Sequence, residues 1–401
     1  MLKRVTIALV VAVICSGAAG AQVRQREFRG YSPEILGQGG SYTAIAQGFE
    51  SLFTNPAGIS AGEPEYRAFD FGFWITANPD QLVSTLGALT DDSSGSQATE
   101  DVIIDSLTEQ FTTNGFGMGA SWRLGFVGER VGAGLEFDSD VYLFGETFPF
   151  GLEGTQDFQL SGAVGYSQPF FLGPVRLDAG LAMRPFVRQF AVVDSETAVS
   201  LLTDVAGLNI DDSSGSSSFT SLPVLSGFGV GFDTGVIAAL GDFRLAFQLR
   251  NLFGTRVDYV ESTFGDFLSA VSSGRLPQSG TTVEHIIPTE FSFGAAWRPD
   301  LGTRAEVFDP VLHFEIRDPF GNTDLDKSRP DSFWTRVHIG SEVELLRFFD
   351  LRLGLNQGYM TYGFGIDIRI LEFKFAAYTQ EFGRYPGDRP VTGMAFEIVI
   401  P

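Results

Sequence analysis

Histidine residues are the first candidates for catalytic chemistry in this chain, and the sequence contains three of them. His285 falls in a predicted loop, whereas His313 and His338 fall on predicted strands. None has the His-Glu-x-x-His spacing of a zinc site, and no Gly-x-Ser-x-Gly motif offers a nucleophilic serine. We therefore predict no catalytic residue, no metal ligands and no cofactor, and we do not expect an enzyme. A serine–histidine pair in the wall of a barrel stays open as an alternative.

Charged residues recur instead at every second position of apolar segments. Glu136, Asp138 and Asp140 alternate with bulky apolar residues, and several arginines follow the same spacing. Side chains two residues apart on a strand share a face, so these charges are expected on one polar face. Arginine binds carboxylates with two nitrogens, which favours ion pairs there. The predicted network consists of Glu136, Asp138, Asp140, Arg244, Arg250, Arg352 and Arg369.

Two-residue alternation extends through most of the chain and predicts an all-β fold. Alternation alone fits either a soluble sandwich or a transmembrane barrel. Apolar faces of about 9–11 residues and charges at mid-strand favour the barrel. Long and short connections also alternate, as loops and turns do in outer-membrane barrels. We predict a transmembrane antiparallel β-barrel of about 14 strands. The strands are expected at 66–77, 115–126, 130–144, 157–167, 174–192, 223–238, 242–253, 289–298, 310–317, 333–346, 349–356, 361–370, 372–380 and 391–400.

The long connections contain further patterns. Apolar residues at helical spacing predict short amphipathic helices at 99–111, 194–206 and 258–271. The run Asp-Asp-Ser-Ser-Gly-Ser occurs at 91–96 and at 211–216, and we interpret it as a solvated linker, with a cation site as the alternative. The chain has 49 acidic against 27 basic residues, which argues against nucleic acid as a partner.

The N-terminus has the features of an export signal. Lys3 and Arg4 precede an apolar run, and Ala19-Gly20-Ala21 supplies the small residues of a cleavage site. We expect a signal peptide at 1–21, cleaved near Ala21, and a barrel at 66–401 in the bacterial outer membrane. Its expected partners there are outer-membrane lipids and the barrel-assembly machinery, and the protein is expected to be a monomer.

Residues 22–65 show neither the two-residue alternation of the strands nor the features of the signal peptide, although they contain apolar side chains that need to be buried. Fourteen strands enclose a lumen too wide for wall side chains to fill. We therefore predict that 22–65 form an N-terminal hatch, or plug, inside the lumen. The apolar residues concerned are Ile35, Leu36, Tyr42, Ile45, Phe49 and Phe53.

Two stretches of the predicted hatch resemble a known family. Gly37–Ala46 (GQGGSYTAIA) and Leu52–Gly58 (LFTNPAG) are similar to the hatch of FadL-like outer-membrane transporters. The resemblance implies a plugged fourteen-stranded barrel for hydrophobic molecules such as long-chain fatty acids, with a kinked third strand as a lateral exit. It also implies that the Asn-Pro turn of the second stretch lies where the plug meets the wall, either as a gate or as a structural turn. These hatch residues are Asn55, Pro56, Ala57 and Gly58.

We therefore expect passive transport of a hydrophobic small-molecule ligand. The alternative is a FadL-like barrel that acts as a structural, secretion-system or surface-interaction protein without fatty-acid transport. A general porin is disfavoured because 22–65 would obstruct it. Candidate ligand contacts are Phe49, Phe53, Arg24, Arg26 and Arg29, the arginines forming either a carboxylate clamp or a solvated periplasmic tail.

Overall fold

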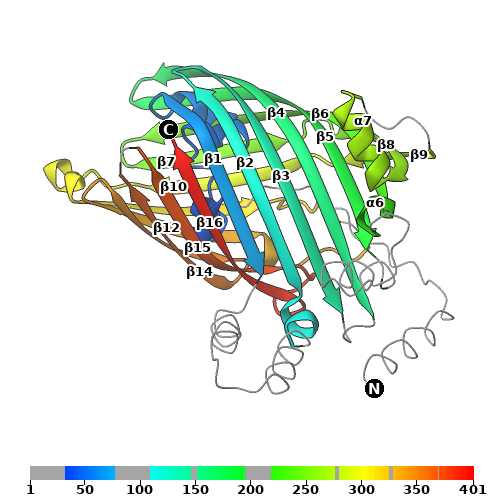
Figure 1. Ribbon diagram of the computed structural model, residues 1–401. Coiled ribbons are helices and arrows are strands. Elements are labelled where there is room, and N and C mark those ends of the chain that lie inside the picture. Colours follow the sequence, from blue (N-terminus) through cyan, green and yellow to red (C-terminus); the bar gives the residue numbers. More distant parts are fainter. Residues whose placement is uncertain are drawn as a thin grey trace.

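The computed structural model describes residues 32–76, 109–145, 151–193, 195, 218–275, 280–324, 328–368 and 370–401. These residues form one closed antiparallel β-barrel (Figure 1). The strands are β1 (Glu65–Thr76), β2 (Phe116–Val127), β3 (Val131–Gly145), β4 (Leu152–Leu172), β5 (Val175–Val193), β6 (Pro223–Leu240), β7 (Phe243–Arg250), β8 (Thr255–Thr263), β9 (Thr282–Ile287), β10 (Glu290–Trp297), β11 (Phe308–Arg317), β12 (Val337–Leu345), β13 (Phe349–Asn356), β14 (Tyr359–Asp367), β15 (Glu372–Glu381) and β16 (Pro390–Ile400).

Sixteen strands occupy fourteen positions around the barrel, because β8 and β9 continue the wall beyond β7 and β10. The ring closes where β1 pairs with β16, and β5 pairs with β6 on the opposite side. This arrangement confirms the predicted fold class. The short helices are α2 (Pro33–Gly37), η1 (Phe49–Leu52), η2 (Pro56–Ser60), η3 (Gln110–Asn114), α6 (Ser218–Ser221), α7 (Phe264–Ser272), η4 (Gly302–Glu306) and η5 (Phe333–Arg336).

The two faces of the wall differ as the alternation predicts. On β5, Leu181 is 52% exposed and Met183 is also exposed. The residues that follow each of them, Ala182 and Arg184, are buried. Exposed leucine and buried arginine reverse the usual order of a soluble protein. This reversal is expected where the outer face meets lipid and the inner face lines a polar lumen.

None of the helices in the described ranges combines the length and the apolar character that a membrane span requires.

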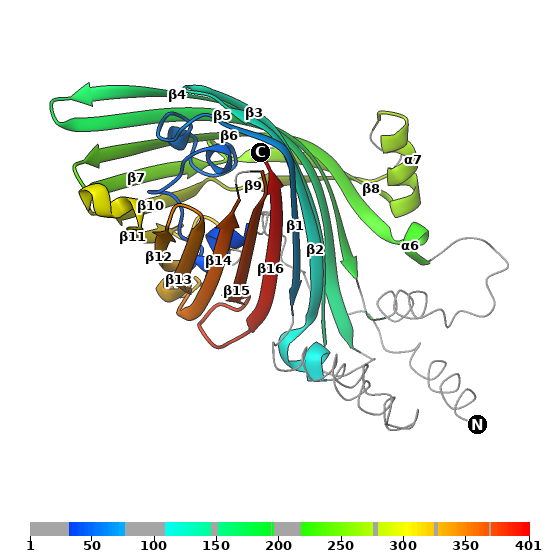
Figure 2. The ribbon, with the colours of Figure 1, turned by 60° about the vertical axis from the view of Figure 1, so that its left-hand side comes forward.

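Residues 32–62, which we call the luminal segment, lie inside the barrel. Figure 2 shows this segment in blue, surrounded by the strands. Its helix α2 packs against β13–β16, η1 packs against β1–β4, and η2 packs against β3–β6. The segment thus reaches most of the circumference with three short helices.

The predicted loop 254–288 is wrong, because it contains β8, α7 and β9. β6 pairs with β7 at Thr234↔Leu249 and with β8 at Phe228↔Asp258, so three extra residues interrupt the second strand. The interruption reverses the alternation. Even-numbered residues of β7 face the lumen, whereas on β8 the odd-numbered residues, such as Val257, face it. Residues up to Thr263 belong to β8, so the helix predicted at 258–271 starts only at Phe264.

The third strand is continuously paired, contrary to the kink that the family resemblance implies. β3 pairs with β2 from Val127↔Gly132 to Phe116↔Leu143 and with β4 over its whole length, with no register shift on either side. Register breaks lie instead on β1, between Arg67 and Asp70, and at Asn251–Gly254, between β7 and β8. The predicted signal peptide, both Asp-Asp-Ser-Ser-Gly-Ser runs, and most of the predicted helices 99–111 and 194–206 lie outside the described residues.

Candidate functional site

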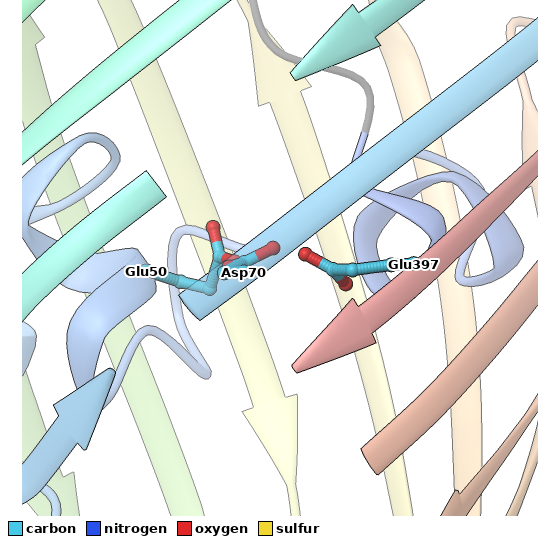
Figure 3. Close-up of side chains that lie close together, drawn as sticks. All are labelled: Glu50, Asp70 and Glu397. Carbon is cyan, nitrogen blue, oxygen red and sulfur yellow. The ribbon is translucent and has the colours of Figure 1, made fainter. Parts of the chain in front are cut away.

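An ionic cluster, which we call the ionic anchor, joins the luminal segment to the seam where the barrel closes. Glu50 on η1, Asp70 on β1 and Glu397 on β16 bring carboxylate oxygens within 4.8 Å of one another (Figure 3). Arg67 Nη1 lies 3.1 Å from Glu50 and 2.5 Å from Asp70. Arg123 Nη1 lies 2.6 Å from the same Glu50 carboxylate, and its Nη2 contacts Glu397. One luminal carboxylate therefore bridges two wall arginines.

Three converging carboxylates could in principle hold a divalent cation. Here the side chains of Arg67 and Arg123 already lie between them, and Lys374 Nζ lies 3.9 Å from Glu397. Arg67 and Lys374 also pair with Glu65 and Glu34, so the residues present fit an extended ion-pair lattice rather than a metal centre. Removing one carboxylate costs about 1.5–3 kcal/mol through the loss of its hydrogen bonds to charged groups, because each arginine keeps another buried carboxylate.

Further polar contacts tie the start of the luminal segment to β11–β15. Glu34 Oε2 lies 2.8 Å from Lys374 Nζ, and Gln38 donates a hydrogen bond of 2.9 Å to Glu342. The backbone amides of Tyr42 and Thr43 both donate to Glu315. Burial alone would raise the pKa of Glu34, but the positive charges of Lys374 and Arg352 lower this pKa to about 2. Glu34 is therefore ionised at neutral pH.

The predicted turn at Asn55 lies directly against the wall. Asn55 is fully buried, and its Nδ2 donates to the Thr43 carbonyl at 3.0 Å. Its Oδ1 accepts the Ala57 amide at 3.2 Å, which caps η2 at the helix start that Pro56 favours. Gly58 lies under the carbonyl of Ala46, within the luminal segment itself.

Glycines of the wall make room for this turn, and we call the contact the close-packed anchor. A Cβ on Gly235 of β6 would lie 1.8 Å from Asn55 Oδ1, and one on Gly180 of β5 would lie 2.2 Å from the Pro56 carbonyl carbon. Ser167 of β4 donates to the Ala57 carbonyl at 3.1 Å. The turn can occupy this position only because the wall has no side chains there.

The two predicted aromatic contacts differ in role. Phe49 is buried against Gly125 and Gly134, where a Cβ would lie within 3 Å of its ring, and Arg67 stacks over it at 5.1 Å. Phe53, with its ring centroid 5.7 Å from that of Phe49, also lines an open cavity. Phe49 is thus a packing residue of the ionic anchor, whereas Phe53 packs in the same cluster and also borders the cavity. Arg24, Arg26 and Arg29 lie outside the described residues.

The lumen contains a cavity of about 900 Å³ between the luminal segment and the wall. This volume is at the upper end of the range found for small-molecule sites. Its lining mixes apolar and charged side chains from both sides. They include Ile35, Phe53, Trp74, Phe190, Arg250 and Tyr378.

The predicted charge network separates into several parts. Arg250 Nη1 donates to the Phe53 carbonyl at 2.7 Å. Arg352 pairs with Glu342 at 2.6 Å, and half-buried Arg244 lines a separate small pocket beside Glu34. Glu136, Asp138 and Asp140 form a row on β3, and Arg369 lies outside the described residues.

The sequence did not single out Arg67, Arg123, Glu50 or Glu397. Arg67 and Asp70 are three residues apart, yet both face the lumen because a register shift separates them on β1. Strict alternation would put them on opposite faces. The only signal was the charge itself, since both arginines lie within otherwise apolar strands.

Sequence comparison finds no matching protein-family model and no matching curated protein. Among solved structures, the toluene transporter TbuX of Ralstonia pickettii is similar, with 13% identity, 92% of this chain and 97% of that chain covered, and a TM-score of 0.48. The toluene transporter TodX of Pseudomonas putida has 11% identity, coverage of 94% and 98%, and a TM-score of 0.44. A Pseudomonas aeruginosa FadL homologue has 11% identity, coverage of 91% and 96%, and a TM-score of 0.42. Similarity at this level adds no argument about function.

Proposed function

We propose that the protein carries hydrophobic small molecules passively across the bacterial outer membrane, with long-chain fatty acids as the substrate class. The observation that supports this most strongly is the cavity of about 900 Å³, which the luminal segment separates from the small pocket beside Glu34 and Arg244. The segment is held there by non-covalent contacts at each anchor. A barrel closed in this way is unsuited to free diffusion of ions and suited to a bound solute.

The cavity offers both parts of a fatty acid a matching surface. Phe53, Trp74, Phe190 and Tyr378 supply apolar area, and each methylene buried against it is worth about 0.8 kcal/mol. Arg250, which borders the same cavity, would bind the carboxylate. No energy source is needed, because the solute moves down its gradient once the luminal segment yields.

Uptake of radiolabelled oleate tests the proposal in a strain deleted for its own fatty-acid transporter. The native chain should restore uptake, and Phe53→Ala should reduce it several-fold by removing ring area from the cavity. Phe253→Ala is the matched control, because this ring is 93% exposed and does not line the cavity. Native protein that is folded in the membrane but restores no uptake would refute the proposal.

A surface-interaction role is the second candidate, and α7 favours it. Phe267 of this helix packs against Phe158, with ring centroids 5.6 Å apart, while Leu268 beside it stays exposed. Phe158 alternates with the luminal Asp157, so α7 covers the outer face of the wall, as Figure 2 also shows. Leu268→Ser should leave oleate uptake unchanged. The second function is favoured if the native chain transports no oleate but captures a partner protein, and if the Leu268→Ser variant fails to capture that protein.

A further inference from the structure

The loop between β15 and β16 is held in shape by one buried carboxylate. Glu381, at the end of β15, is 0% exposed. Its Oε1 accepts the backbone amides of Gly383 and Arg389, at 2.6 Å and 2.7 Å. Its Oε2 accepts the Gly387 amide and the Tyr359 hydroxyl, each at 2.8 Å. The loop is therefore a firm support for the side chains that it carries.

Arg389, the last residue of this loop, lies against aromatic rings of β3. Its guanidinium carbon is 3.9 Å from the ring centroid of Phe144 and 5.4 Å from that of Tyr142. Phe382 of the same loop stacks on Tyr142, with ring centroids 5.4 Å apart. The Tyr142 hydroxyl donates to the Asn114 carbonyl at 3.0 Å, which fixes this ring as well.

These four side chains form what we call the rim cluster, because they border the luminal cavity where β3 and β15 end. Its members are Tyr142, Phe144, Phe382 and Arg389. The cluster thus combines one positive charge with three rings at the edge of the cavity. An apolar chain with an anionic end matches this combination.

Arg389 differs from other arginines that line the cavity. Arg123, Arg188, Arg317 and Arg336 each form an ion pair with a carboxylate. Arg389 forms none with any residue that the structure describes, and its Nε is buried without a hydrogen-bond acceptor. A buried donor without an acceptor lowers stability, so this guanidinium retains unused capacity to bind an anion.

The acids near Arg389 leave that capacity free. Glu381 already accepts four hydrogen bonds, as described above. Glu153, which lies across from Phe144 on β4, is exposed, and water and salt therefore screen its charge. Stacking on Phe144 uses the flat face of the guanidinium, so the N–H groups at its edge remain available.

We propose that Arg389 binds the carboxylate of a long-chain fatty acid at the rim of the cavity, with Phe144 and Phe382 against the adjoining methylenes. This inference rests on the proposed transport function and adds a second position, besides Arg250, at which the anionic end is recognised. Arginine offers a carboxylate two parallel N–H groups, whereas a neutral head group gains much less from it. Because the loop is held by Glu381, little freedom is lost when the acid binds.

The experiment measures binding to full-length protein in an uncharged detergent, with oleate and oleyl alcohol as probes that share one chain and differ in the head group. Trp74 borders the same cavity, so tryptophan fluorescence reports occupancy. Arg389→Gln should weaken oleate binding about tenfold, as expected for a lost hydrogen bond between charged groups, and should leave binding of oleyl alcohol unchanged. Arg256→Gln is the matched control, because this exposed arginine of β8 does not line the cavity, and it should bind oleate as the native chain does.

Folding of each variant is checked by the heat-dependent shift in gel mobility that intact barrels show. A folded Arg389→Gln variant with native oleate binding would overturn the inference. An equal loss for oleate and oleyl alcohol would also overturn it, because Arg389 would then act only on the shape of the rim. If Arg389→Gln fails to fold, Arg389→Met, which keeps the packing against Phe144, replaces it under the same criteria.

Oleate uptake, measured in parallel, separates this inference from the proposed function. Uptake by the native chain together with native oleate binding by Arg389→Gln would refute the rim site alone. Native protein that binds oleate through Arg389 but restores no uptake would refute transport and leave the rim site standing.

Discussion

The luminal segment is held by two anchors of opposite character. At the ionic anchor, Glu50 meets Arg67 and Arg123 through charges that act over several ångströms. At the close-packed anchor, Asn55 and Pro56 fit against wall positions without side chains, and the tolerance there is a fraction of an ångström. Loss of one charge should therefore weaken the first anchor in a graded way, whereas one added methyl group should displace the second outright.

The largest effect is expected from Gly235→Ala. The new Cβ would lie 1.8 Å from Asn55 Oδ1, so the turn must move away from β6 and open the lumen. We expect a steady ion conductance in planar bilayers, where the native barrel is closed. Gly162→Ala is the matched control, because its Cβ would meet only ordinary contacts at 3.6 Å and 3.7 Å on the outer face. Equal conductance in both variants would remove the distinction between the anchors.

Glu50→Gln tests the ionic anchor. It leaves Arg67 paired with Asp70 and Arg123 paired with Glu397, and we expect a loss of about 1.5–3 kcal/mol in stability from the hydrogen bonds to Glu50. The loss is measured as a shift of the urea midpoint in detergent. Glu306→Gln breaks an ion pair with Arg347 that is mostly exposed, and it should cost less than about 1 kcal/mol. A similar shift for both would mean that the buried lattice contributes no more than a surface pair.

Asn55→Ala sharpens the comparison with a smaller change. It removes the cap of η2 and the hydrogen bond to the Thr43 carbonyl but adds no atom. We expect about 1–2 kcal/mol of destabilisation without the conductance of Gly235→Ala. Conductance as large as that of Gly235→Ala would show that hydrogen bonding, rather than close packing, holds the turn.

The last effect concerns pH and is confined to acidic conditions. The pKa of Glu34 is about 2, below its ordinary value of 4.5. A lowered pKa stabilises the folded state above the ordinary value, and this contribution disappears as pH falls from 4.5 towards 2. The stability difference between native protein and Glu34→Gln should therefore be constant from pH 7 to about 5 and should shrink below that. A difference that changes between pH 7 and 6 would contradict this assignment.

Much of the wall could be predicted because its period is visible in the sequence. On β14, apolar residues alternate with polar residues or glycine without interruption, so strand and face follow directly. The prediction failed at Asn251–Gly254, where extra residues reverse the phase and conceal β8.

The two anchors were predictable to different degrees. The turn at Asn55 was found through its resemblance to a known family. Its complement could not be found, because Gly180 and Gly235 lie on the consecutive strands β5 and β6 and become neighbours only in the register of that pair. Glu50 has no periodic context, and the register shift between Arg67 and Asp70 conceals their shared face. Pairing across distant strands has no local signature.

We propose that solute passes only when the luminal segment leaves the wall. Ser60 Oγ and Ser167 Oγ lie 2.7 Å apart at the close-packed anchor, so Ser60→Cys with Ser167→Cys places a disulfide there. The chain's single cysteine, Cys15, lies in the predicted signal peptide. Oxidised cells should lose oleate uptake, and a reductant should restore it to the level of the native chain. Full uptake by protein that is completely cross-linked would contradict the account.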